Sequence, residues 1–158
     1  MAFHACKGLT TVSFPKCTRI EDYGLRECSN LREAYFPECA TIAYGFISCN
    51  KLVSVYLPKC SYLGYMTFAR CYSLPSLDLP KMATIGSSCF INCSSLMSLT
   101  LGGSSVVKLS NTNAFASSPM SISSLTGSFG SIYVPASLVD AYKSATNWAT
   151  YAARITAI

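Results

Sequence analysis

The residues of this sequence that could do chemistry are mostly its cysteines. Nine occur in 158 residues, at positions 6, 17, 28, 39, 49, 60, 71, 89 and 93. Thiols can pair as disulfides, bind a metal ion or act as nucleophiles. The first seven, however, lie 11, 11, 11, 10, 11 and 11 residues apart. So regular a spacing indicates an internal repeat rather than a single reactive site.

The other residues give little support for a catalytic site or a metal site. Nucleophilic catalysis needs a base held beside the nucleophile, and the sole histidine is His4, near the start of the sequence. Cys89 and Cys93 could form half of a zinc site, but zinc needs about four converging ligands. The glycine pair Gly102-Gly103 lacks the lysine and spacing of a phosphate-binding loop. We therefore expect no catalytic residue, metal or cofactor, and a protein that is not an enzyme.

Composition narrows the class of protein further. The chain is 51% apolar and 12% charged, with a net charge of +5. This excludes a disordered chain, and the length fits one domain at roughly 150 residues each. No stretch approaches the roughly 18 apolar residues of a membrane-spanning helix. Lys16, Lys59 and Lys81 recur after successive prolines with Glu38 between them, a pattern typical of a soluble sheet rim and not of a nucleic-acid-binding patch.

The first half of each repeat predicts a short strand. In units of about 22 residues the segments are CKGLTTVSFPKC, CSNLREAYFPEC, CNKLVSVYLPKC, CYSLPSLDLPKM and CSSLMSLTLGGS. Their shared pattern, Leu-x-x-Val-x-Phe-Pro, ends in an alternation of apolar and other residues, which is typical of a strand. Proline then ends the strand because it cannot donate to a continuing ladder.

The second half of each unit is equally regular. Apolar residues follow the second cysteine position at one fixed offset, and a further apolar residue comes a few positions later. These are Ile20, Ile42, Leu63 and Ile85, and then Leu25, Phe46, Phe68 and Phe90. One such unit cannot bury its own apolar face, whereas stacked copies can, by pairing their strands in parallel and forming internal ladders.

A ladder also explains the cysteines. Equivalent residues on neighbouring rungs lie about 4.8 Å apart with parallel side chains, slightly beyond the roughly 3.5 to 4.5 Å between the Cβ atoms of a disulfide. Such a ladder spreads thiols along a line and does not gather them around a metal. We interpret the cysteines as free, buried thiols that fill small positions in the core.

The repeat resembles the BspA-type leucine-rich repeat, found in surface proteins of host-associated bacteria and some protists. The match covers residues 3 to about 115, through the proline and both cysteine positions. It implies a β-rich α/β leucine-rich repeat solenoid of parallel strands. Residues 131–155 resemble the short helical cap of this family: Ile132 to Val134 as a last strand, then a helix opened by Pro135. The apolar face of that helix is Leu138, Val139, Tyr142 and Trp148. The domain division is then 1–130 for the repeats, the last degenerate, and 131–158 for the cap.

The outward positions of the predicted strands are the candidate ligand-binding residues. They form two columns on the concave face, and six of them combine aromatic, acidic and hydroxyl groups. These are Glu33, Tyr35, Ser54, Tyr56, Ser76 and Asp78. Tyrosines with short polar neighbours are common on binding surfaces. The alternative is that Tyr35 and Tyr56 stack on adjacent rungs only to stabilise the sheet.

These features favour a non-enzymatic binding module of a cell-surface or secreted protein. Its ligand would be a protein or glycan, host extracellular matrix included, with no nucleic acid and no membrane span. A spacer or assembly domain of a larger surface protein is the alternative, and an intracellular scaffold, favoured by unpaired thiols, is a third. The segment MAFHACKGLT is no signal peptide, and Phe3 and Cys6 match Leu25 and Cys28. We therefore expect an earlier half-repeat and an export signal upstream.

Overall fold

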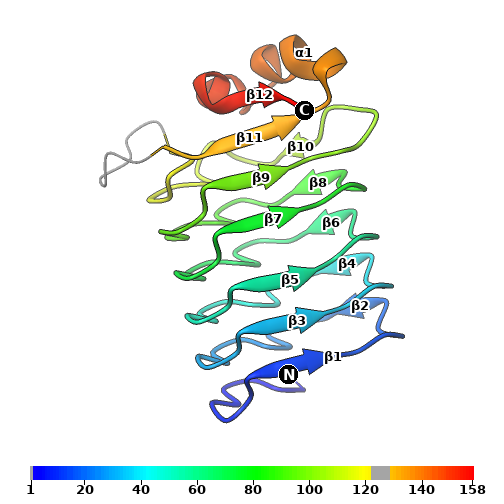
Figure 1. Ribbon diagram of the computed structural model, residues 1–158, viewed down its shortest axis with the longest axis vertical. Coiled ribbons are helices and arrows are strands. Elements are labelled where there is room, and N and C mark those ends of the chain that lie inside the picture. The colour runs from blue at the N-terminus through cyan, green and yellow to red at the C-terminus, as the bar shows by residue number, and fades with distance from the viewer. Residues whose placement is uncertain (1, 122–128) are drawn as a thin grey trace.

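The computed structural model describes residues 2–121 and 129–158, and it shows a solenoid of stacked rungs (Figure 1). On one side each rung contributes a strand of three or four residues. These strands are β1 (Thr11–Ser13), β3 (Glu33–Tyr35), β5 (Ser54–Tyr56), β7 (Ser76–Asp78), β9 (Ser98–Thr100) and β11 (Ser131–Val134). On a second side each rung contributes two strand residues. These strands are β2 (Arg19–Ile20), β4 (Thr41–Ile42), β6 (Tyr62–Leu63), β8 (Thr84–Ile85) and β10 (Lys108–Leu109).

All strand pairs are parallel and in the register that the repeat predicts. Ser13 lies opposite Tyr35, which lies opposite Tyr56. On the second side, Ile42 lies between Ile20 and Leu63. The predicted leucine-rich repeat solenoid is therefore confirmed, with one rung for each repeat unit.

Inward residues of each rung stack on their equivalents in the next rung. The rings of Phe46, Phe68, Phe90 and Phe115 form one such column, with centroids 5.1, 5.6 and 5.3 Å apart and interplanar angles of 3° or less. All four are fully buried. The apolar positions chosen from the sequence thus form the ladders expected of them.

A turn segment closes the third side of each rung. Its last turn places one residue in the left-handed conformation, with φ between 56° and 62° at Ala5, Glu27, Ser48, Arg70, Asn92 and Ser117. The turns hydrogen-bond from rung to rung: the Glu27 amide donates to the Ile47 carbonyl at 2.8 Å, and the Ser48 amide donates to the Ala69 carbonyl at 2.8 Å. Backbone pairing therefore continues around all three sides.

The hydrogen-bond ladder of the first side is interrupted between β5 and β7. The strands form two sheets, in the orders β1-β3-β5 and β7-β9-β11-β12. Pro75 occupies the position of Val53, whose amide donates to the Arg32 carbonyl at 2.9 Å on the preceding rung. Because proline has no amide hydrogen, this donor is lost at the boundary between the two sheets.

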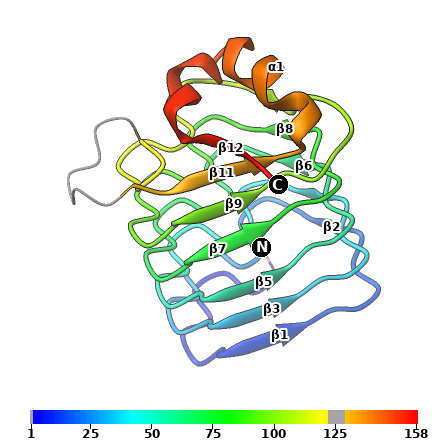
Figure 2. The ribbon, with the colours of Figure 1, turned by 45° about the horizontal axis from the view of Figure 1, so that its top comes forward.

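The cap contains more than the strand and helix predicted. After β11 come the 3₁₀ helix η1 (Ala136–Leu138), helix α1 (Val139–Ser144), the 3₁₀ helix η2 (Ala149–Arg154) and strand β12 (Ile155–Ala157). β12 pairs in parallel with β11, so β11 is not the last strand of its sheet. Trp148 lies beyond α1, and Leu138 and Val139 are only half-buried. Figure 2 shows the cap lying across the end of the stack.

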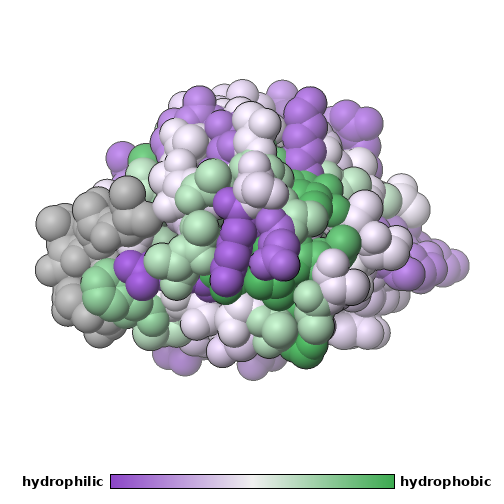
Figure 3. Space-filling model, turned by 90° about the horizontal axis from the view of Figure 1, so that it is seen from above, coloured by the Kyte–Doolittle hydropathy of each residue, from purple (hydrophilic) through white to green (hydrophobic). Residues whose placement is uncertain are grey.

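Polar groups of the cap complete the outer edge of β10. The Val107 amide donates to the Tyr142 hydroxyl at 3.0 Å, and Trp148 Nε1 donates to the Val107 carbonyl at 2.6 Å. Asn147 Nδ2 donates to the Leu109 carbonyl at 2.7 Å. Side chains thus take the place of the next rung, and an open strand edge is avoided. Viewed from this end, the surface mixes hydrophilic and hydrophobic residues (Figure 3).

We predict that Trp148→Phe destabilises the protein by about 1 to 3 kcal/mol, because the buried Val107 carbonyl loses its donor. Urea unfolding measures the change. Tyr62→Phe, which removes a hydroxyl from a tyrosine that is 44% exposed, is the control and leaves the midpoint unchanged. Equal midpoints for Trp148→Phe and the parent would contradict the capping role.

Candidate functional site

The six predicted ligand-binding residues lie on the outward positions of three neighbouring strands. Glu33 and Tyr35 are on β3, and Ser54 and Tyr56 are on β5. Ser76 and Asp78 are the outward residues of β7. All six are exposed. We call this surface the strand face.

Tyr35 and Tyr56 stack at its centre. Their ring centroids are 5.1 Å apart, and the ring planes differ by 5°. Tyr35 remains 46% exposed and Tyr56 50% exposed. Stacking therefore accounts for part of each ring, and the remaining aromatic surface is open to a ligand.

The two acidic residues of the strand face lie next to this pair on different rungs. Glu33 shares strand β3 with Tyr35, and Asp78 is on β7, one rung beyond Tyr56. Glu33 is opposite Ser54 in the register of β3 and β5. Asp78 is opposite Thr100 in the register of β7 and β9, and the interrupted ladder separates Asp78 from Tyr56 on β5. Neither carboxylate forms an ion pair with any residue that the structure describes. Carboxylates and hydroxyls can accept hydrogen bonds from a ligand, and flat rings can stack on it. These groups are therefore suited to binding.

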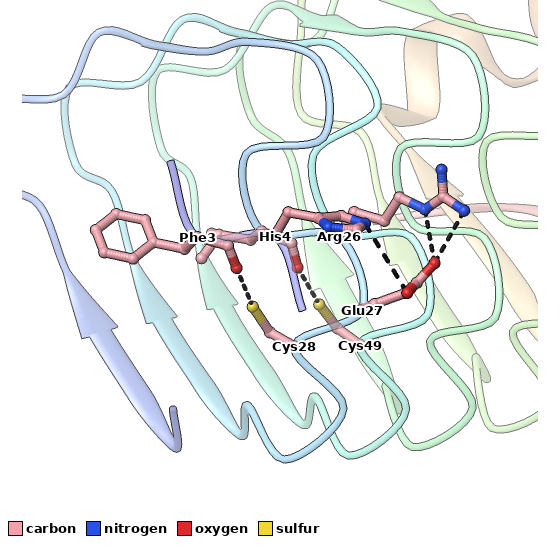
Figure 4. Close-up of polar contacts among 7 residues, drawn as sticks. Phe3, His4, Arg26, Glu27, Cys28 and Cys49 are labelled. Carbon is pink, nitrogen blue, oxygen red and sulfur yellow. Dashed lines mark hydrogen bonds and ion pairs between the residues drawn. The ribbon is translucent and has the colours of Figure 1, made fainter. Parts of the chain in front are cut away.

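The cysteines form two hydrogen-bonded columns. In the first, each thiol donates to a carbonyl of the preceding rung: Cys28 to Phe3, Cys49 to Leu25, Cys71 to Phe46 and Cys93 to Phe68, with sulfur–oxygen distances of 3.0, 3.1, 3.2 and 3.0 Å. Figure 4 shows the first two thiols pointing at these carbonyls. In the second column, Cys17, Cys39 and Cys60 each donate to the carbonyl two residues later.

All nine cysteines are free, as predicted, and seven are buried. Cys6 is exposed and Cys17 half-buried, contrary to the prediction for every ladder position, because among the described residues their rung has a neighbouring rung on one side only. The prediction treated the thiols as compact hydrophobes. Their pattern gave no sign that they also satisfy a column of backbone carbonyls.

Burial sets the protonation of these thiols. It raises the pKa of Cys39 to about 11 and that of Cys60 to about 12. It likewise raises the pKa of Cys93 to about 12, and that of Cys49 still further. Since the thiolate is the nucleophile and the metal ligand, these buried thiols are suited to structure. Among the described residues, no three histidine, cysteine or acidic side chains are grouped to hold a metal ion.

A second set of aromatic residues was not singled out from the sequence. Tyr23, Tyr44 and Tyr65 form a column on the turn segments, with centroids 5.4 and 5.5 Å apart. The signal for them was available, since each follows the inward residue Ile20, Ile42 or Leu63 by two or three positions.

The predicted lysine rim is partly neutralised. Lys59 Nζ lies 2.7 Å from a carboxylate oxygen of Glu38, so the acid that interrupts the lysine series pairs with one member of it. Within the described ranges, no helix has the length and apolar character needed to cross a bilayer.

Comparison with known proteins gives two matches and one negative result. A family model described as "BspA type Leucine rich repeat region (6 copies)" matches residues 42–136. The crystal structure of a leucine-rich repeat protein from T. pallidum is similar in fold, with a TM-score of 0.63 and 19% identity. That similarity covers 79% of this chain and 58% of the T. pallidum chain, so this chain spans little more than half of it. A search of curated proteins found no match.

We predict that alkylation of the native protein labels Cys6 first and Cys17 second, because these are the two thiols that burial does not shield. Unfolding without reductant then exposes the rest, and mass spectrometry finds nine labels. A lower count in the unfolded, unreduced protein would reveal disulfides and contradict the assignment of free thiols.

We also predict that alkaline pH unfolds the protein through its thiols. The pKa of Cys60 is raised from an ordinary value of 9.0 to about 12, so between these limits the unfolded chain binds fewer protons and stability falls as pH rises. The full contribution is present below about pH 9. Relative to a Cys60→Ala variant, the parent should lose about 1.4 kcal/mol between about pH 8 and about pH 10. Urea titrations at both values test this, and an unchanged difference between the two proteins would contradict it.

Proposed function

Because the chain belongs to the BspA-type leucine-rich repeat family, we propose that it is a non-enzymatic binding module of a cell-surface or secreted protein. Leucine-rich repeat domains are protein-interaction modules, and BspA-type members are usually at the surface or secreted. The proposed ligand is a protein or glycan, such as a component of host extracellular matrix. The proposed contact surface is the strand face.

The observation that supports this surface is the stacked pair Tyr35 and Tyr56. Burying two half-exposed aromatic rings on a ligand removes a large apolar area from water, and tyrosine is enriched among the residues that dominate binding energy. The sheet holds both rings at fixed positions, so little side-chain entropy is lost on binding. Glu33 and Asp78 then restrict the partner, since an acidic group facing them would be repelled.

The arrangement of the strand face gives no comparable support for general acid–base catalysis. A general acid or base needs a side chain within hydrogen-bond reach of a reacting group, with a pKa suited to its task. Glu33 and Asp78 are exposed and lie on β3 and β7, two rungs apart, so the two carboxylates are not neighbours. The division of 1–130 as the recognition unit and 131–158 as its cap is part of this proposal.

A spacer or assembly role is the second candidate. It is supported by the uninterrupted sheet β2-β4-β6-β8-β10 and by the continuous phenylalanine column, which together make a stiff rod. In that case the strand face is only a stabilising surface, and removing its tyrosines changes stability without changing any binding.

We predict that Tyr35→Ala combined with Tyr56→Ala weakens ligand binding at least tenfold, or about 1.4 kcal/mol, because both aromatic anchors are lost. A panel of immobilised extracellular-matrix proteins and glycans identifies the ligand, and surface plasmon resonance measures its affinity. Urea unfolding confirms that the double variant is folded.

Tyr62→Ala is the matched control, since Tyr62 is 44% exposed but lies on β6, on the second side of the solenoid. It should retain the affinity of the parent. Equal affinity in the double variant and the parent would overturn the strand face as the binding surface. A panel without any binder would favour the spacer role.

A further inference from the structure

A groove follows the turn segments of four successive rungs, on the third side of the solenoid. It encloses about 280 Å³. Its polar and aromatic lining consists of Tyr23, Tyr44, Tyr65, Arg26, Arg70 and Asn92. None of these residues belongs to the strand face, so the groove is a separate site.

One wall of the groove is the tyrosine column. Tyr44 contacts Tyr23 with ring centroids 5.4 Å apart and Tyr65 with centroids 5.5 Å apart, at interplanar angles of 44° and 71°. Tyr65 is 41% exposed, and Tyr23 and Tyr44 are half-buried, so part of each side chain remains open to solvent. The wall therefore offers both apolar contact and hydrogen bonding.

The turns that present two of these tyrosines are strained. Tyr23 has a φ of 61° and Tyr44 a φ of 51°, a left-handed conformation that bulky residues rarely adopt. The turn also needs the glycine that follows, because a Cβ at Gly45 would lie 2.4 Å from Ile42 Cγ2. A large aromatic residue thus stands where glycine or asparagine would fold more easily, and such outliers gather at functional sites.

The groove is positively charged. Arg26 lies against the Tyr23 ring, 5.1 Å from its centroid, and pairs with Glu27 at 2.9 Å. Figure 4 shows Glu27 between Arg26 and His4. Arg70 is exposed and has no ion pair within the part of the chain that the structure describes. None of the described residues that line the groove is acidic, so among them Arg70 carries the unneutralised charge.

Apolar side chains also line the groove beside the tyrosine column, and we call them its floor. Ile47, Ala69 and Ile91 come from three consecutive rungs at equivalent positions. Their carbonyls already accept from Glu27, Ser48 and Arg70 at 2.8, 2.8 and 2.9 Å. A ligand therefore cannot pair with these carbonyls as an added strand and must bind through side chains.

We propose that this groove binds a short acidic segment of a partner protein, with an aliphatic side chain against Ile47 and Ile91 and a carboxylate on Arg70. Tyrosine, arginine and methionine are enriched at the centres of protein interfaces, and Met66 adds to this lining. An arginine fork matches a carboxylate through paired hydrogen bonds. The aliphatic floor favours a peptide over a glycan, because isoleucine side chains offer a sugar no hydrogen bonds.

The test uses the isotopically labelled chain and a short blocked peptide of alternating glutamate and leucine. A peptide with lysine in place of glutamate is the charge control. NMR titration should shift the amide signals of Tyr44, Ile47 and Arg70 saturably while leaving those of Tyr35 and Tyr56 unchanged. The lysine peptide should produce no such shifts.

Fluorescence anisotropy with the labelled peptide then measures how much the Arg70 charge and the tyrosine column contribute to binding affinity. Arg70→Gln should weaken binding about tenfold, and Tyr44→Ala by a similar factor. Arg32→Gln removes an exposed arginine outside the groove and should have no effect. Thermal unfolding of each variant confirms that the fold is retained.

The proposal would be overturned by the absence of saturable shifts in the groove, by equal binding of the lysine peptide, or by equal effects of Arg70→Gln and Arg32→Gln. Binding of a sulfated dextran oligosaccharide in the groove without binding of the acidic peptide would also overturn it, and would assign the site to a glycan. The strand face is tested independently, since its double tyrosine variant leaves the groove intact.

Discussion

The structure depends on parallel hydrogen bonding between rungs that repeat at one spacing. Backbone hydrogen bonds between neighbouring rungs fix the spacing and the register of the rungs. Each inward side chain must therefore pack against the equivalent side chain of the next rung. Flat rings satisfy this constraint well, and Phe46, Phe68, Phe90 and Phe115 stack with centroids 5.1 to 5.6 Å apart. Where an amide donor is missing, as at Pro75, the sheet divides.

The same constraint makes polar groups a problem wherever the ladder cannot satisfy them. Inside the solenoid, backbone carbonyls of one rung accept hydrogen bonds from thiols of the next rung. These thiols belong to Cys28, Cys49, Cys71 and Cys93. At the carboxy-terminal end, Tyr142, Asn147 and Trp148 bond to the backbone of residues 107 and 109. The buried thiols and the large side chains of the cap therefore have the same role. Both form hydrogen bonds with backbone groups that would otherwise be unpaired, and an unpaired buried carbonyl is destabilising.

Repetition also explains how such a chain acquires columns of outward-facing aromatic residues. A residue type that recurs at an outward position becomes a column, so two tyrosines make a stacked pair on the strand face and three make a wall on the turn side. Charge then distinguishes these surfaces. Acidic Glu33 and Asp78 accompany the first column, whereas Arg26 and Arg70 accompany the second. One scaffold thereby presents two chemically different faces, which is consistent with a module built for contact.

The sequence by itself determined the features that are periodic. The spacing of the cysteines, the inward positions of the strands and the adjacency of Tyr35 and Tyr56 all follow from one repeat, because each needs only local pattern and uniform stacking. Only the tertiary structure decided the rest. Strand β12 has three residues and no repeat pattern, and the bonds of the cap join residues 35 to 41 positions apart. The groove depends on how turns from four rungs align, and the thiols act as donors only because a carbonyl of the preceding rung lies within reach. Such contacts are set by three-dimensional proximity, which no period in the sequence encodes.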